Sequence, residues 1–207
     1  MWPLGLVAFL LSWPVVRSLT VRLTRGRFRT QALGTQPDRI NLVRATQPNW
    51  RQEQLREHSA RQLSAAGFVN AGTFQIREMP ELTLGLYANA QENTYAMLYD
   101  HPRTGFWAEF VTRYQDGTVA NFTTLEPMDI EVPNGFMHVA APHLTIGDLW
   151  KTMLADRPAK PMLPCNPFTA AVDFEKGYAA AMAYHKQQPT ITSVETTSDE
   201  EEMRQAA

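Results

Sequence analysis

The sequence predicts an α+β protein: an N-terminal membrane-anchor helix, then one helix, a five- or six-stranded antiparallel meander sheet, and two C-terminal helices. Three observations predict this class. The first sixteen residues carry no charged side chain. Short segments of alternating apolar and polar residues, separated by turn residues, fill the middle of the chain, as in consecutive strands. Apolar residues at helical spacing precede and follow those segments. We expect the two C-terminal helices to cover one face of the sheet.

Residues 1–21 are expected to form a transmembrane or interfacial anchor helix. Sixteen helical residues cover roughly 24 Å, and continuation to residue 21 gives about 31 Å, close to the ~30 Å hydrocarbon core of a bilayer. Pro14 would kink or end this helix, so a helix lying in the membrane interface is an alternative. A cleaved signal peptide and an ordinary buried segment are two further interpretations of the same block.

Arginines follow the apolar block directly, and five of them are candidates for contact with lipid headgroups: Arg17, Arg22, Arg25, Arg27 and Arg29. Because these cations lie only on the C-terminal flank, the positive-inside rule places the remaining chain in the cytoplasm as part of a single-pass protein. Residues 22–48 are interpreted as a basic linker. Nucleic acid is an alternative partner for a basic segment. No known nucleic-acid-binding module accompanies this segment, so we do not expect nucleic acid to be the partner.

The globular domain is expected over residues 49–187, followed by an acidic, disordered tail over 188–207. Asn49, with Gln52 three positions later, predicts a capped helix start, and Gly67 predicts the end of that helix. Six segments have the pattern of strands, the last being short: 68–77, 82–88, 95–99, 106–114, 118–125 and 136–140.

Asp116–Gly117 is the clearest turn signal in the chain. Between two strands this dipeptide favours a two-residue type I′ turn. Such a turn would pair Tyr114 with Val119 and Thr112 with Asn121.

Two helices are predicted after the strands. Thr145 and Asp148 form a capping pattern at the start of the first, whose apolar stripe comprises Ile146, Leu149, Trp150, Met153 and Leu154. Asn166–Pro167 can open the second, whose apolar face comprises Phe174, Tyr178, Ala181, Met182 and His185.

No catalytic, metal or nucleotide motif stands out, and the sequence predicts neither a metal nor a cofactor. Cys165 is the only cysteine, so no intramolecular disulfide can form, and its proline-rich surroundings favour a packing role. An enzyme would depend on Asp100, His101, His138 and His143, provided that the turns that hold them gather at one end of the sheet.

Trp107, Glu109 and Arg113 share one face of a predicted strand. If helices cover that face, these residues are candidates for a buried ligand-binding site between sheet and helices. If that face meets water, they are ordinary solvated strand residues.

Taken together, these patterns favour a membrane-tethered, non-catalytic interaction or scaffold protein with a small cytoplasmic domain. Its expected partners are membrane lipid, through the N-terminal helix, and another protein. A ligand-binding or sensory domain is the first alternative, and an enzyme that uses the histidines at the loop ends is the second.

Overall fold

The computed structural model describes residues 37–127 and 135–187 of the 207-residue chain. The predicted anchor over 1–21, most of the basic linker and the tail over 188–207 lie outside the described residues. Within the described part, no helix is both long and apolar enough to cross a bilayer.

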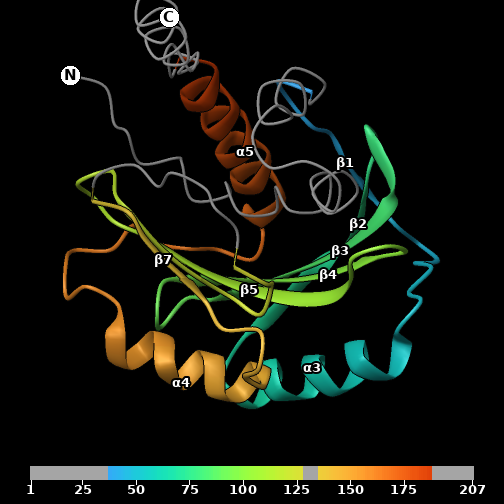
Figure 1. The fold of residues 1–207 in the computed structure, drawn as a ribbon, viewed down its shortest axis with the longest axis horizontal. Coiled ribbons are helices and arrows are strands. Elements are labelled where there is room, and N and C mark those ends of the chain that lie inside the picture. Colours follow the sequence, from blue (N-terminus) through green and yellow to red (C-terminus); the bar gives the residue numbers. More distant parts are fainter. Residues whose placement is uncertain (1–36, 128–134, 188–207) are drawn as a thin grey trace, which may run out of the picture.

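The centre of the fold is a single sheet whose strand order follows the sequence (Figure 1). Strands β1 to β6 each pair antiparallel with the next, whereas β7 runs parallel to β6. The strands are β1 (Leu42–Arg44), β2 (Val69–Ile76), β3 (Met79–Asn89), β4 (Thr94–His101), β5 (Gly105–Arg113), β6 (Val119–Thr123) and β7 (Met137–Ala140).

The α+β class therefore holds, but the prediction of a five- or six-stranded antiparallel meander is wrong in two respects. The sheet has seven strands, because residues 42–44, which we assigned to the linker, pair with β2. It is also mixed, because β7 begins beside the starting end of β6 and runs parallel to it. Parallel neighbours need a crossover connection, while a tight turn joins only antiparallel ones.

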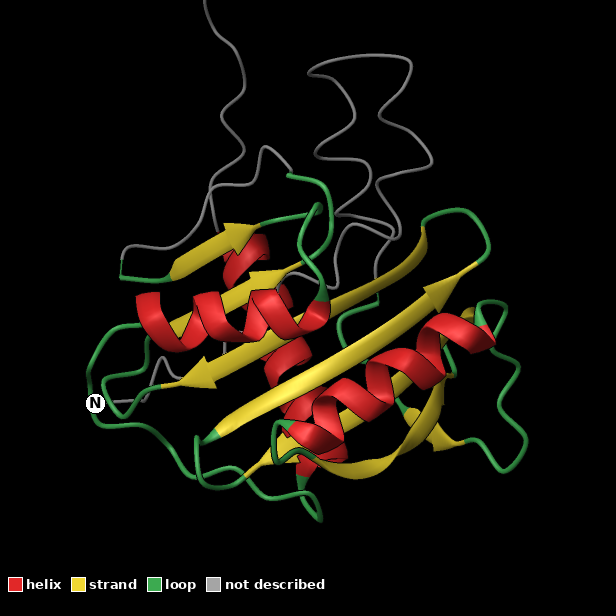
Figure 2. Ribbon diagram, turned by 90° about the horizontal axis from the view of Figure 1, so that it is seen from below, coloured by secondary structure: helices red, strands yellow, loops and turns green. Residues whose placement is uncertain are grey.

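Helices cover both faces of the sheet, so the expectation that the last two helices share one face is also wrong. Helices α3 (Glu53–Ala65) and α4 (Ile146–Asp156) lie on one face and α5 (Ala170–Gln187) on the other (Figure 1). Figure 2, seen from the opposite side to α5, shows α3 and α4 in front of the sheet. Residues 82–89 of β3 are consequently buried, whichever face of the sheet they lie on.

Each face has its own apolar core. On the α5 face, Phe174, Tyr178 and Met182 pack against residues that include Leu84 and Met97. On the other face, Leu149, Trp150 and Met153 of α4 and Leu63 of α3 pack against residues that include Phe110 and Phe122. The stripe predicted for α4 is thus correct for its buried members, while Leu154 is 40% exposed.

The start of α3 is held differently from the prediction. Asn49 does not cap this helix; its N-cap residue is Gln52, whose side chain makes no capping bond. Instead, the Asp100 carboxylate of β4 accepts hydrogen bonds from the backbone N–H groups of Arg51 (2.6 Å) and Gln52 (2.9 Å). A carboxylate from a distant strand thus satisfies donors that the first turn leaves unpaired.

The β5–β6 hairpin also differs from the prediction, by one residue. Arg113 pairs with Val119 and Val111 with Asn121. The Tyr114 N–H donates to the Thr118 carbonyl, and Gly117 adopts a positive φ of 88°. Asp116 does not share that conformation, so the connection is a three-residue loop with a glycine in the left-handed region and not a type I′ turn.

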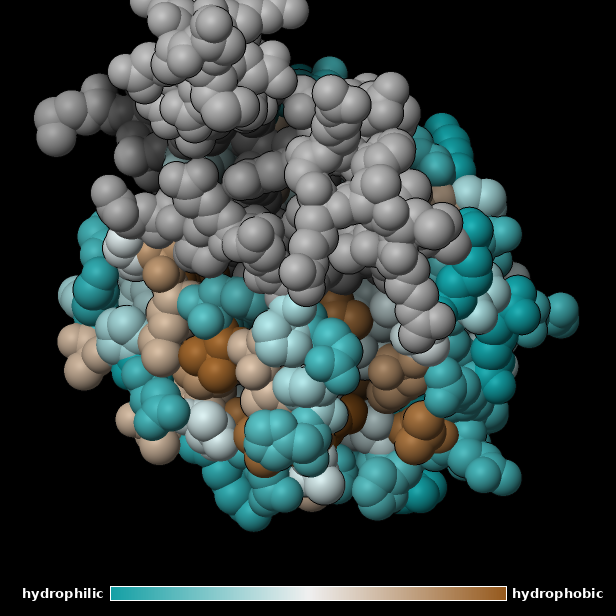
Figure 3. Space-filling view, viewed as in Figure 1, coloured by the Kyte–Doolittle hydropathy of each residue, from teal (hydrophilic) through white to brown (hydrophobic). Residues whose placement is uncertain are grey.

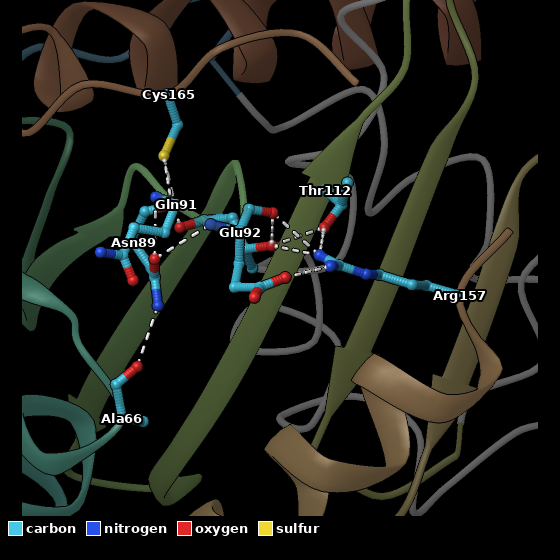
Figure 4. A network of polar contacts seen from close by, with 8 residues as sticks. Ala66, Asn89, Gln91, Glu92, Thr112, Arg157 and Cys165 are labelled. Atoms are coloured by element: carbon cyan, nitrogen blue, oxygen red, sulfur yellow. Dashed lines mark hydrogen bonds and ion pairs between the residues drawn. The ribbon is translucent and has the colours of Figure 1, made fainter. Parts of the chain in front are cut away.

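A polar network fastens the β3–β4 turn to several segments that are distant in the sequence (Figure 4). Asn89 donates to the Ala66 carbonyl at the end of α3 and accepts the N–H groups of Gln91 and Glu92. Arg157, which follows α4, pairs with Glu92 and donates to hydroxyls of Thr94 and Thr112, whose own side chains bond to each other at 2.7 Å. The thiol of Cys165 donates to the Asn89 carbonyl at 3.1 Å.

Candidate ligand-binding site

Glu109 is the most deeply buried acidic side chain among the described residues, with no exposed surface. It lies in the middle of β5 on the α5 face. One carboxyl oxygen accepts a hydrogen bond from the Tyr99 hydroxyl of β4 at 2.9 Å, and the other accepts one from the Asn121 amide of β6 at 2.7 Å. Tyr99 and Asn121 thus hold the carboxyl from the strands on either side of β5. Together with Trp107 and His138, described below, these three residues form what we call the Glu109 cluster.

The environment of Glu109 makes its charged form costly. Burial raises the pKa of the Glu109 carboxyl from its ordinary 4.5 to about 7, although the hydrogen bonds from Asn121 and Tyr99 lower it in part. No cation among the described residues forms an ion pair with this group. Near neutral pH the carboxyl therefore exists in both forms, and it can donate or accept a proton.

An aromatic pair borders the carboxyl. The rings of Tyr99 and Trp107 stack with their centroids 4.6 Å apart and an interplanar angle of 11°. Trp107 is only 1% exposed, yet its indole N–H has no hydrogen-bond partner among the described residues. Because a buried donor without an acceptor costs free energy, this N–H is a polar group that a bound molecule would satisfy.

His138 extends the cluster to the edge of the sheet. It is the register partner of Asn121 across the β6–β7 pair. Its neighbours Met137 and Val139 pack against the core under α3 and α4, so alternation along the strand places His138 on the face that carries Glu109. Burial lowers the pKa of the imidazole, and its Nδ1 has no partner among the described residues.

Arg113 lies on the same buried face, but its ion-pair partner is Asp173 and not Glu109. Its guanidinium forms an ion pair with Asp173 in the first turn of α5 at 3.3 Å and stacks 5.2 Å from the centre of the Tyr95 ring. Asp173 also accepts a hydrogen bond from the Tyr95 hydroxyl, and burial together with this bond raises the pKa of that tyrosine to about 12. Arg113 therefore attaches α5 to the sheet and, within the described part of the chain, does not act as a counter-ion for Glu109.

The structure does not bring the histidines of the enzyme hypothesis together. His101 ends β4, six positions along the strands and three strands across from His138, which corresponds to about 25 Å. His143 is exposed in the turn before α4. Asp100 faces α3, where it holds the helix start. His101 instead accepts N–H groups of its own turn, and burial lowers its pKa.

Sequence reasoning selected Trp107 and Glu109 but missed Tyr99 and Asn121. The predicted register paired Asn121 with Thr112, which would have turned its side chain away from Glu109. Tyr99 could have been found, because a direct β4–β5 hairpin places it diagonally opposite Glu109.

In the described segments, no three histidine, cysteine or acidic side chains are grouped as metal ligands would be. Comparison of the chain with protein-family models, curated proteins and solved structures gives no match.

Proposed function

We propose that the described domain binds a small organic molecule at the Glu109 cluster. The observation that carries this proposal is a carboxyl group without exposed surface and without a cation among the described residues, placed beside a buried indole N–H that lacks an acceptor. A domain that needed only a stable core would gain more from apolar residues at these positions, because buried polar groups that are partly satisfied are costly.

The described part of the face seen in Figure 3 offers less support for a protein partner than the Glu109 cluster offers for a ligand. In Figure 3, apolar side chains on the described part of the visible face are scattered among hydrophilic ones and do not form one continuous patch. We therefore place the ligand-binding function ahead of the scaffold function that the sequence favoured.

The test uses the Trp107 indole as a reporter. The full-length chain in detergent micelles is titrated with two size-matched sets: ethanolamine, ethylene glycol and glycolate, and benzylamine, benzyl alcohol and benzoate. The Trp107 indole N–H resonance, assigned with Trp107→Phe, is followed by NMR. We expect at least one compound to shift this resonance saturably, and the shift to be lost in Glu109→Gln. If none of the six shifts it, the ligand-binding proposal fails.

Location is a separate proposal, motivated by the uncharged block 1–16 and the arginines after it. We propose that this segment holds the domain at the cytoplasmic face of a membrane. Leu10→Arg together with Leu11→Arg should move the full-length protein from the carbonate-resistant membrane fraction to the supernatant. A wild-type chain that carbonate extracts completely would contradict an integral anchor.

A further inference from the structure

We propose that the ligand of the Glu109 cluster is a small organic amine whose protonated nitrogen lies against the Glu109 carboxylate as its counter-ion. This inference rests on the proposed function and adds the chemical class of the ligand.

No cation among the described residues neutralises the Glu109 carboxylate, and this favours a cationic ligand. Both hydrogen bonds to Glu109 come from neutral groups, a phenol and an amide, and both suit an acceptor carboxylate. An ionised carboxylate with no exposed surface is costly unless a cation accompanies it. Arg113 is committed to Asp173, and burial favours the neutral form of His138. The described residues thus place a carboxylate that none of their own cations neutralises, and we infer that a bound molecule supplies the cation.

The stacked rings of Tyr99 and Trp107 also favour a cationic ligand. A protonated amine beside the carboxylate can also lie near the stacked rings of Tyr99 and Trp107, whose π-faces attract cations. An anionic ligand would meet the Glu109 charge, and no described cation is free to offset it. A neutral ligand would leave the carboxyl either protonated or uncompensated. Among the three charge classes, a cation therefore satisfies the most groups.

Two polar atoms near Glu109, the Trp107 indole nitrogen and Nδ1 of His138, indicate what the rest of the ligand carries. The indole N–H of Trp107 requires an acceptor, and Nδ1 of His138 is a further polar atom without a partner in the described part of the chain. An amine that also carries an oxygen acceptor, such as an amino alcohol, would satisfy these groups in addition to Glu109. Ethanolamine is the smallest probe with both features.

The proposal predicts that binding is linked to the ionisation of Glu109. An amine that binds the carboxylate must displace its proton, so the affinity should fall roughly tenfold for each pH unit below about 7 and level off above it. Other titratable and charged groups on this face include Tyr95, Tyr99, Arg113, His138, Cys165, Asp173 and Tyr178. Burial lowers the pKa of the His138 imidazole from 6.5, and His138→Gln tests its share of the pH dependence.

The experiment repeats the Trp107 titration between pH 5 and pH 8 on the full-length chain, with proton release measured by calorimetry in two buffers of different ionisation enthalpy. We expect ethanolamine or benzylamine to bind with release of a proton near pH 6, and their neutral and anionic counterparts to bind at least tenfold more weakly. Glu109→Gln should remove both binding and proton release. Glu126→Gln, which removes the same charge from an exposed position after β6, should change neither.

The outcomes separate this inference from the proposed function. Binding of an alcohol or a carboxylate but not of an amine would overturn the amine assignment and leave a ligand site in place. Amine binding that is independent of pH and survives Glu109→Gln would also overturn it. If no compound shifts the Trp107 resonance, the proposed function fails, and the amine assignment fails with it. Because glutamine is close to isosteric with glutamate, a folded Glu109→Gln protein is expected, and the retained Trp150 indole resonance verifies it.

Discussion

At the scale of single residues, Glu109 links folding to pH. Its carboxyl titrates near pH 7 in the folded chain and near 4.5 when unfolded. Between those values the folded state binds more protons than the unfolded state, so the free energy of unfolding falls as pH rises through this window and is level above it. His101 and His138, whose pKa values are lowered by burial, contribute with the opposite sign.

We therefore predict that the Glu109 contribution to stability declines by about 3 kcal/mol between pH 4.5 and pH 7.5. The measurement is urea unfolding of wild type and Glu109→Gln at several pH values. Both proteins contain the same histidines, so the histidine contributions cancel when the free energy of unfolding of Glu109→Gln is subtracted from that of the wild type. Glu126→Gln serves as the exposed control and should follow the wild type. A difference that does not change with pH would show that Glu109 does not titrate in this range.

Cys165 is the second residue whose environment changes its chemistry. Burial raises the pKa of its thiol from 9.0 to about 11, and the thiol donates to the Asn89 carbonyl. At pH 8 the thiolate fraction is about 100-fold smaller than in the unfolded chain. We predict that native Cys165 reacts with a disulfide reagent at least 100-fold more slowly than the urea-unfolded protein. Comparable rates, followed by absorbance of the released thiol, would disprove a buried, inert cysteine.

At the scale of elements, Arg157 connects the end of α4 to the β3–β4 turn and to β5. It pairs with Glu92 and donates to the Glu92 carbonyl and the Thr94 hydroxyl (Figure 4). The arginine side chain is only 11% exposed, so removing it would take away several charge-assisted hydrogen bonds at a largely buried site.

We predict that Arg157→Ala lowers the free energy of unfolding by about 2 to 3 kcal/mol. Lys151→Ala is the matched control, because its ion pair with Asp148 is largely exposed and should contribute less than about 1 kcal/mol. Both values come from urea denaturation. Equal effects of the two substitutions would contradict the role assigned to the network.

The elements that sequence patterns predicted well are those set by local periodicity. The strands from 68 to 125 and the helix capped by Thr145 follow directly from alternation and capping residues, and the Thr145 hydroxyl accepts the Asp148 N–H as predicted. Local sequence patterns could not predict contacts between segments that are distant in the sequence. The Asp100 carboxylate at the start of α3 depends on where β4 passes, and the partner of β7 depends on a crossover that no local pattern specifies.

The candidate site shows the same limit more sharply. Trp107 and Glu109 were identified because they share one strand face, which two-residue periodicity defines. Their partner Asn121 was lost through an error of one residue in a hairpin loop, since one residue exchanges the two faces of a strand. The distinction between a two-residue and a three-residue loop depends on the conformation of Asp116, which the Asp–Gly dipeptide does not determine.

At the scale of the whole molecule, the two apolar cores share the same strands. Residues of β5 alternate between them, with Val111 in the core under α5 and Phe110 in the core under α3 and α4. A strand cannot lose its packing on one face and keep its register on the other, so the described domain should unfold as one cooperative unit.

We predict that damage to one core is reported equally by the other. Phe174 of α5 has no exposed surface, and Phe174→Ala should lower the free energy of unfolding by about 3 to 4 kcal/mol. In a urea titration the indole resonances of Trp107, on the α5 face, and Trp150, on the opposite face, should lose intensity at the same reduced midpoint. Val172→Ala, a half-exposed position on the same helix, should move neither midpoint by a comparable amount. Separate midpoints for the two tryptophans would mean that the faces unfold independently, and a site on the α5 face could then open without loss of the layer beneath the sheet.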